Sequence, residues 1–215
     1  MTKSIHEETI FYQSGNHIIV DDRKINIVTK FEEPLIVVLD KVLSNQECDQ
    51  LIEFSKDKLK RSKISSTGEE EVNEIRTSSS MFFQESENDI LEELEKRISD
   101  IMCIPIEHAE GIQILRYTPS QEYKAHYDFF NSASKAAKNN RISTLVIYLN
   151  DVEEGGETYF PKLNLSIPPK KGSAVYFEYF YNSEYLNELT LHGGAPVIKG
   201  EKWVATQWMR KQKIR

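Results

Sequence analysis

A histidine and an aspartate two residues apart, His126 and Asp128, have the types and spacing to do chemistry. They lie in the segment RYTPSQEYKAHYDFF, Arg116–Phe130, which is predicted to be extended. On a strand, residues i and i+2 point to the same face, so the imidazole and the carboxylate would lie side by side. Such a pair provides two of the three ligands of a facial metal triad, and the third must be a histidine from a distant strand.

His192 is the best candidate for the third ligand, and Lys202 follows it within the segment HGGAPVIKGEKW. A lysine at that separation can hold an acidic cosubstrate beside the metal. An H-x-D motif alone is weak evidence, because it occurs by chance in surface turns. Its combination with a distal histidine and a lysine, separated by short apolar and aromatic strands, predicts a metal site.

Composition limits the class of protein. The chain has 215 residues, of which 39% are hydrophobic and 28% charged, enough for a sizeable core in one or at most two domains. A net charge of -7 argues against a broad nucleic-acid surface. Cys48 and Cys103 lie outside any paired motif, so we expect reduced thiols. Neither a signal-peptide core nor a membrane-spanning run is evident, so a cytoplasmic protein without a membrane partner is expected.

The N-terminal half is predicted to support the site. Residues 1–33 suggest an irregular arm or weak edge strands, and Leu35–Leu39 is predicted to be a buried strand. Ser44 and Glu47 form a capping-box pattern, which predicts a helix to about Leu59. The side chains expected to be buried by this helix are Leu51, Ile52 and Phe54.

A second helix is predicted after a strand at Arg76–Gln84, beginning at Ser86. Its apolar stripe would comprise Ile90, Leu91, Leu94, Ile98 and Ile101. The charged segment 60–74 is expected to be a mobile loop, which in an enzyme could cover the site or could be an uninvolved solvated loop.

From Gly111 onward the sequence changes to short strands divided by glycine, proline and asparagine turn signals. The predicted strands are Ile112–Tyr117, Glu122–Tyr127, Ile142–Leu149, Glu157–Phe160, Leu165–Ile167, Ala174–Phe180, Leu189–Leu191 and Trp203–Met209. This pattern favours an α+β protein with a double-stranded β-helix, or jelly-roll, core. We expect one catalytic domain, 1–215, with a helical support region at 1–109 and the jelly roll at 110–215.

These residues also carry a family resemblance, over about residues 110–209. The sequence resembles the iron(II)- and 2-oxoglutarate-dependent dioxygenases, and among them the prolyl 4-hydroxylases that act on collagen-type peptides, especially the small soluble bacterial ones. The residues that carry the resemblance are Arg116–Tyr117, Gln121, Tyr123, His126–Asp128, Gly155–Thr158, His192, Pro196–Val197, Gly200, Lys202–Trp203 and Trp208. One departure is Gly193–Gly194, where many relatives carry a serine.

The resemblance implies iron(II) held by His126, Asp128 and His192. It also implies that 2-oxoglutarate binds the metal through its C1 carboxylate and keto oxygen, beside O2, while Lys202 holds its distal carboxylate. The hydroxyls of Tyr117 and Thr158 match the family's neutral donors, although both residues could instead be packed strand residues. The implied reaction converts 2-oxoglutarate to succinate and carbon dioxide and hydroxylates C4 of a peptidyl proline, with ascorbate as reductant.

For the substrate, the resemblance suggests a proline-containing, possibly collagen-like peptide contacted by Arg141, Tyr123, Trp208 and, more weakly, Glu110. Aromatic faces suit the flat apolar proline ring, although each aromatic residue could instead belong to the core. The segment Phe129–Asn140 follows the metal ligands directly and could close over the substrate. A homodimer is left open by the sequence.

Other functions remain open at this stage. A nucleic-acid demethylase would share the metal triad, but such enzymes generally grip the cosubstrate with arginine rather than lysine. A hydroxylase of free amino acids is a further alternative. A non-catalytic jelly-roll binding protein would have no reason to keep the ligands, the lysine and the hydroxyls together. Succinate release that depends on iron and a proline-rich peptide would discriminate among them.

Overall fold

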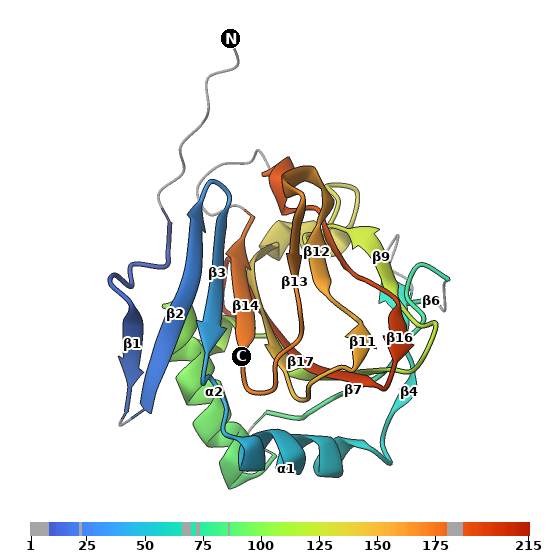
Figure 1. Ribbon diagram of the computed structural model, residues 1–215. Helices are drawn as coiled ribbons and strands as arrows, with labels where there is room; N and C mark the ends of the chain where they lie inside the picture. Colours follow the sequence, from blue (N-terminus) through green and yellow to red (C-terminus); the bar gives the residue numbers. More distant parts are fainter. Residues whose placement is uncertain (1–8, 22, 66–69, 72–73, 86, 180–186) are drawn as a thin grey trace.

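Two facing antiparallel sheets form the body of the protein, as the jelly-roll prediction requires (Figure 1). The computed structural model describes residues 9–21, 23–65, 70–71, 74–85, 87–179 and 187–215. The nine-stranded major sheet runs in the order β1 (His17–Val20), β2 (Arg23–Glu32), β3 (Leu35–Asp40), β14 (Ala174–Glu178), β10 (Arg141–Tyr148), β17 (Lys202–Arg210), β8 (Gln113–Tyr117), β7 (Ser79–Phe82), β4 (Lys60–Arg61).

The four-stranded minor sheet faces the middle of the major sheet. Its order is β13 (Leu165–Ile167), β12 (Thr158–Phe160), β15 (His192–Gly194) and β9 (Tyr123–His126). Two short pairs complete the strands, β11 (Glu154–Gly155) with β16 (Val197–Lys199), and β5 (Ile64–Ser65) with β6 (Glu70–Glu71). Single 3-10 turns occur at η1 (Ile106–His108), η2 (Lys135–Asn139), η3 (Pro161–Leu163) and η4 (Glu188–Thr190).

Two helices cover the other face of the major sheet, behind and below the strands in Figure 1. Helix α1 (Asn45–Ser55) begins at the predicted capping box, in which the Ser44 hydroxyl accepts from the Glu47 amide at 3.2 Å and Glu47 Oε2 accepts from the Ser44 amide at 2.6 Å. It ends four residues earlier than predicted. The predicted burial is confirmed for Leu51, whereas Ile52 is half-buried and Phe54 is exposed.

Helix α2 (Asp89–Met102) is capped by Asn88, whose side chain accepts from the Leu91 amide at 3.1 Å. The predicted start at Ser86 falls on a residue outside those described. The apolar stripe is confirmed at Leu91, Leu94, Ile98 and Ile101, which are buried against the major sheet. No helix among the described residues is long and apolar enough to cross a membrane.

Period-two alternation assigns the side chains of the central strands to two separate cores. On β17, Trp203, Ala205 and Met209 pack toward the helices, while Val204 packs between the two sheets. Strand β10 divides in the same way, with Leu145 and Ile147 in the helical core. Because the intervening positions point between the sheets, Lys202, Thr206, Trp208 and Thr144 are directed into the interior of the jelly roll.

One predicted strand near the site is wrong. Leu189–Leu191 is not a strand but the η4 turn and its cap, and the strand begins at His192. Of the two alternatives for residues 1–33, the described residues form strands: β1 and β2 lie at one edge of the major sheet, next to the predicted buried strand β3. Strands β4 and β7, which follow α1, lie at its other edge. Cys48 and Cys103 are unpaired thiols.

Candidate active site

The two predicted histidine ligands meet because β9 and β15 pair in an antiparallel register that places His126 opposite His192. Asp128 follows just past the end of β9, in a bend, although the sequence predicts that the whole segment Arg116–Phe130 is extended. Its Oδ1 lies 3.4 Å from Nε2 of His126, and its Oδ2 lies 3.5 Å from Nε2 of His192. One ligand atom from each of the three residues falls within 4.8 Å of the others, which is a spacing that one metal ion can bridge.

The second nitrogen of each ring fixes the orientation of the first. Nδ1 of His126 lies 2.8 Å from the carbonyl oxygen of Lys124, and Nδ1 of His192 lies 2.9 Å from that of Thr190. A carbonyl only accepts, so each Nδ1 carries the proton and each Nε2 keeps its lone pair for a metal. Two imidazoles and one carboxylate on one face are the donor set that iron(II) favours, so the residues present fit this metal.

Asp128 is held by a hydrogen-bonded chain that the sequence did not reveal. The Thr144 hydroxyl donates to Oδ2 of Asp128 at 2.6 Å, so the Tyr179 hydroxyl, 2.9 Å from Thr144 Oγ1, must donate to Thr144. Burial opposes ionisation of Asp128, but His192, His126 and Arg141 together hold its pKa well below the usual range. Burial also lowers the pKa of His192 to about 4. The carboxylate and the neutral imidazole that a metal requires are therefore the stable forms at neutral pH.

Lys202 is the predicted cosubstrate lysine, and its side chain is 4% exposed. It pairs across the β17–β8 ladder with Tyr117, and its Nζ lies 5.6 Å from the centre of the Tyr117 ring and 5.7 Å from that of Tyr148. No described residue accepts a hydrogen bond from this ammonium. Burial lowers the pKa of Lys202 to about 8. A buried ammonium without a hydrogen-bond acceptor fits the carboxylate of a cosubstrate.

The predicted neutral donors lie around the same cavity. Thr158 is opposite Gly194 in the β12–β15 pairing, and its Oγ1 accepts a hydrogen bond from the Tyr148 hydroxyl at 2.7 Å. The Thr158 proton thus remains available to a ligand. The narrow cavity, of about 50 Å³, is lined by the three metal-ligand candidates together with Lys202, Tyr117 and Thr158.

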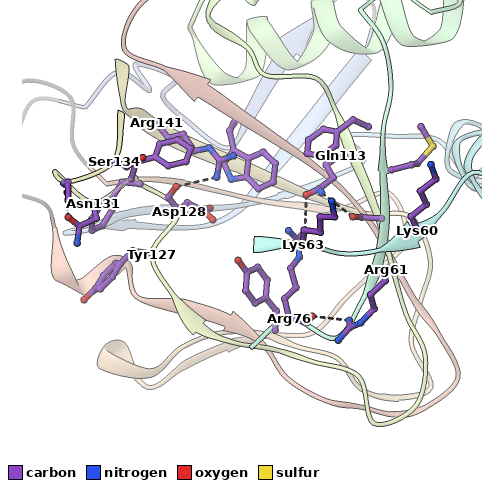
Figure 2. Close-up of a pocket in the computed structure, with 18 of the residues that line it drawn as sticks. Lys60, Arg61, Lys63, Arg76, Gln113, Tyr127, Asp128, Asn131, Ser134 and Arg141 are labelled. Carbon is purple, nitrogen blue, oxygen red and sulfur yellow. Dashed lines mark hydrogen bonds between the residues drawn. The ribbon is translucent and has the colours of Figure 1, made fainter. Parts of the chain in front are cut away.

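The narrow cavity adjoins a wider cleft of about 860 Å³, shown in Figure 2. Arg76, Tyr123, Asp128 and Trp208 line both spaces. The Tyr123 ring stacks on His126, with ring centres 3.5 Å apart. The two predicted aromatic contacts for a peptide, Tyr123 and Trp208, therefore lie where the cleft meets the metal-ligand candidates.

The remaining predicted peptide residues form an ion pair. Arg141 lines the cleft and donates two hydrogen bonds of 2.7 Å to Glu110, while its guanidinium stacks 3.9 Å from the centre of the Trp208 ring. Glu110 also contacts Arg210 at 2.5 Å. Glu110 is not among the residues that line the cleft, so the structure places it as a support for Arg141.

Arg76 is a cleft residue that sequence reasoning missed. It is 6% exposed, its Nη2 donates to Gln113 at 2.8 Å, and its guanidinium lies 4.9 Å from the centre of the Tyr123 ring. Its Nε has no hydrogen-bond partner, and no described carboxylate pairs with it. The only signal was an arginine at the start of the predicted strand Arg76–Gln84, which does not by itself indicate burial.

Both predicted covering segments border the cleft. Phe129, Phe130, Asn131, Ala133 and Ser134 line one side, and Lys60, Arg61 and Lys63 line another. Asn140 ties the ends of the first segment together, since its side chain accepts from the Phe130 amide at 2.8 Å and donates to the Phe130 carbonyl at 2.9 Å. Closure over a substrate stays a prediction, and residues 66–69 and 72–73 of the second segment lie outside those described.

The glycine after the distal histidine has a steric explanation. A Cβ on Gly193 would lie 2.6 Å from the Tyr159 side chain and 2.8 Å from the backbone oxygen of Tyr123. Distances this short require one of the neighbouring strands to move. The departure at Gly193 therefore accompanies close packing of β15 between β12 and β9.

Comparison with known proteins identifies relatives of this chain. A model of the 2OG-Fe(II) oxygenase superfamily matches residues 112–210. The chain is 37% identical over 220 residues to probable prolyl 4-hydroxylase 10 of Arabidopsis thaliana, covering 92% of this chain and 75% of the relative.

Solved structures show the same fold. The viral collagen prolyl hydroxylase of Paramecium Bursaria Chlorella virus-1, in complex with 2OG, is 34% identical with a TM-score of 0.66, covering 82% of this chain and 96% of the viral one. A Trichoplax adhaerens prolyl hydroxylase, in complex with a hypoxia inducible factor peptide fragment, has a TM-score of 0.61 at 15% identity over 81% of this chain and 82% of its own. At that identity the second likeness concerns the fold alone.

Proposed function

Because this chain belongs to the prolyl 4-hydroxylases of the 2OG-Fe(II) oxygenase superfamily, we propose that it hydroxylates C4 of proline residues in peptides or proteins. The iron, when bound, couples conversion of 2-oxoglutarate to succinate and carbon dioxide to insertion of one oxygen atom of O2 into the proline C–H bond, the other atom entering succinate. The observation that carries this proposal is the narrow cavity, which brings the His-Asp-His cluster and the buried lysine together beside an aromatic cleft.

The protein side chains have separate tasks in this proposal. His126, Asp128 and His192 would hold iron(II), with Thr144 donating to Asp128 so that its carboxylate keeps one orientation. The depressed pKa values of Asp128 and His192 keep both groups in their ligating forms without an added base.

Lys202 would pair with the distal carboxylate of 2-oxoglutarate inside the narrow cavity. Its charge is desolvated before binding, and no described residue accepts a hydrogen bond from it, so the ligand carboxylate would supply a directly hydrogen-bonded counter-charge. Thr158 and Tyr117 would add neutral donors, and Tyr148 fixes the direction of the Thr158 hydroxyl by donating to it.

The cleft would position the target proline over the metal. Tyr123 and Trp208 offer flat apolar faces at the junction of cleft and cavity, which suits a proline ring. Arg141 keeps Trp208 in place by stacking on it, and Glu110 in turn fixes Arg141.

Three finer points of the proposal rest on the family resemblance. These are ascorbate as the reductant that keeps iron in the iron(II) state, a collagen-like substrate in preference to other proline-rich chains, and assembly as a homodimer. Each can be tested alongside the main activity, by omitting ascorbate, by comparing peptides and by measuring molecular mass in solution.

The test is incubation of the purified protein with iron(II), 2-oxoglutarate and proline peptides, followed by mass spectrometry. We expect the gain of one oxygen atom on proline, accompanied by stoichiometric succinate, and neither product without iron. Free proline serves as the control for a free amino-acid hydroxylase. Succinate release that is equal with and without any peptide, and no modified proline, would contradict the proposal.

A further inference from the structure

Basic side chains are concentrated in the cleft, although the chain as a whole is acidic, with 34 Asp and Glu against 27 Lys and Arg. The basic residues that line it are Lys58, Lys60, Arg61, Lys63, Arg76 and Arg141. Asp128, a metal-ligand candidate, is the one acidic residue among its described lining. This excess of cations is opposite to the overall charge, so it is a local property of the cleft.

Three of these cations have no acidic partner among the described residues. Lys58 pairs with Glu87 at 2.9 Å, and Arg141 pairs with Glu110. In contrast, no described carboxylate pairs with Lys60, Arg61 or Arg76. We call these three residues the basic wall.

The hydrogen bonds that two members of the basic wall do make are to neutral groups. Arg61 donates to the backbone carbonyls of Arg76 and Ser78, at 2.9 and 3.0 Å, and Arg76 donates to the Gln113 amide oxygen. Arg76 lines the cleft although it is only 6% exposed, and its buried Nε has no hydrogen-bond partner among the described residues. A desolvated guanidinium with an unused donor is a site for an anionic or strongly polar ligand group.

The basic wall lies beside the path that a bound peptide must take. Lys60 and Arg61 lie on β4, the edge strand that pairs with β7, and Asn131 and Ser134 lie across the cleft with Asp128 (Figure 2). An extended or polyproline-type peptide advances about 3.1 Å per residue. With its target proline at Asp128, its flanking residues on one side pass Arg76 and then the β4 cations.

We propose that this cleft selects proline peptides that carry glutamate or aspartate on one side of the target proline. The inference rests on the proposed function and names its substrate class. Each exposed charge pair would favour the acidic peptide about 2- to 5-fold in affinity. The basic wall would also raise the association rate at low ionic strength.

The experiment uses the full chain loaded with iron(II) and 2-oxoglutarate under argon, and fluorescently labelled peptides of equal length with one central proline. A block of glutamates is placed before or after the proline, and glutamine or lysine replaces it in matched peptides. Binding is measured by fluorescence anisotropy, and hydroxylation by mass spectrometry after oxygen is admitted. We expect one of the two acidic peptides to bind about tenfold more tightly than its glutamine match.

Charge reversal on the protein locates the effect. Lys60→Glu should lower the ratio of acidic to neutral affinity by about threefold or more and should favour the lysine peptide. Lys24→Glu is the matched control, because Lys24 is also an exposed strand lysine and lies outside the cleft. In the parent protein the ratio should approach one near 0.5 M salt, where charges are screened within about 4 Å.

The outcomes separate this inference from the proposed function. Equal affinities for acidic and glutamine peptides, or an acidic preference that Lys60→Glu leaves intact, overturn the basic wall as a selectivity element even if both peptides are hydroxylated. If a single-stranded oligonucleotide displaces the labelled acidic peptide at a lower concentration than the unlabelled peptide does, the proposal that the cleft binds an acidic peptide is overturned in favour of a nucleic acid. Absence of proline hydroxylation with every peptide refutes the proposed function, whatever the affinities.

Discussion

Replacing Lys202 by methionine removes one charge from the narrow cavity and keeps nearly the same side-chain length. The parent ammonium is 4% exposed, so a carboxylate bound there would form a buried ion pair. Breaking such a pair costs roughly 3–5 kcal/mol. Because every 1.4 kcal/mol changes an equilibrium tenfold, the affinity for 2-oxoglutarate should fall by a factor on the order of 10² to 10³.

The same substitution should stabilise the ligand-free protein. Burial lowers the pKa of Lys202 from 10.5 to about 8, which corresponds to about 3 kcal/mol of penalty for the folded, charged form. Below about pH 8 both the folded and the unfolded chain carry the proton, so the penalty is fully present. Between about pH 8 and 10.5 the folded chain has lost this proton while the unfolded chain still carries it, so the free energy of unfolding of the parent protein rises with pH. Lys202→Met should lack this gain and should be up to about 3 kcal/mol more stable at pH 7.

Two measurements check both halves of this prediction. Calorimetric titration of 2-oxoglutarate into the metal-loaded, oxygen-free protein gives the affinity, and urea unfolding of the ligand-free protein at several pH values gives the stability. Lys202→Arg restores the charge but should recover only part of the affinity, because the planar guanidinium is longer and differently shaped than an ammonium. Lys199→Met, at an exposed lysine of β16, is the matched control. An affinity of Lys202→Met within about threefold of the parent would refute the assignment.

Three further substitutions test other parts of the site. His192→Ala should abolish iron binding and turnover while circular dichroism stays that of the folded protein, and full activity would exclude His192 as a ligand. Thr144→Val removes the donor to Asp128 and should weaken iron affinity about 10- to 100-fold, measured by chelator competition, and unchanged affinity would make Thr144 a packing residue. Trp208→Ala should cost about 2 kcal/mol in peptide binding, measured by anisotropy, with little change for 2-oxoglutarate, and equal losses for both would contradict its place on the peptide side.

The members of the metal cluster could be predicted from the sequence because each belongs to a short motif. His126 and Asp128 are two residues apart, and a distal histidine and a lysine in one later segment complete the pattern. The prediction that these groups converge needed only the jelly-roll topology. The exact pairing of His126 with His192 depends on the β9–β15 register, which involves residues far apart in the chain and could not be derived from either strand alone.

One strand prediction failed because of a local cap, and the burial of Arg76 was missed because it depends on partners that are distant in sequence. Leu189–Leu191 is apolar and suggests a strand, but Asn187 caps a single turn there by accepting from the Leu189 amide. The burial of Arg76 arises from β7, β8 and β9 together, so an isolated arginine gave no indication of it.

Thr144 was within reach of sequence reasoning. It shares the strand face of Val146 and Tyr148, and that face was predictable from alternation along Ile142–Leu149. Tyr179 lies within the predicted strand Ala174–Phe180 and shares a face with Val175 and Phe177, but its hydrogen bond to Thr144 depends on the pairing of β14 with β10 and could not be inferred from either strand alone.

The alternation along β17 has a consequence for how new activities could be obtained from this chain. Val204 and Thr206 border the narrow cavity, whereas Trp203 and Ala205, between and beside them, belong to the helical core. A combinatorial library that varies Val204 and Thr206 alone would change the shape of the narrow cavity and leave the residues that pack against the helices unchanged. Along this strand, side chains that border the narrow cavity alternate with side chains that pack against the helices, and Val204 also contributes to the core between the two sheets.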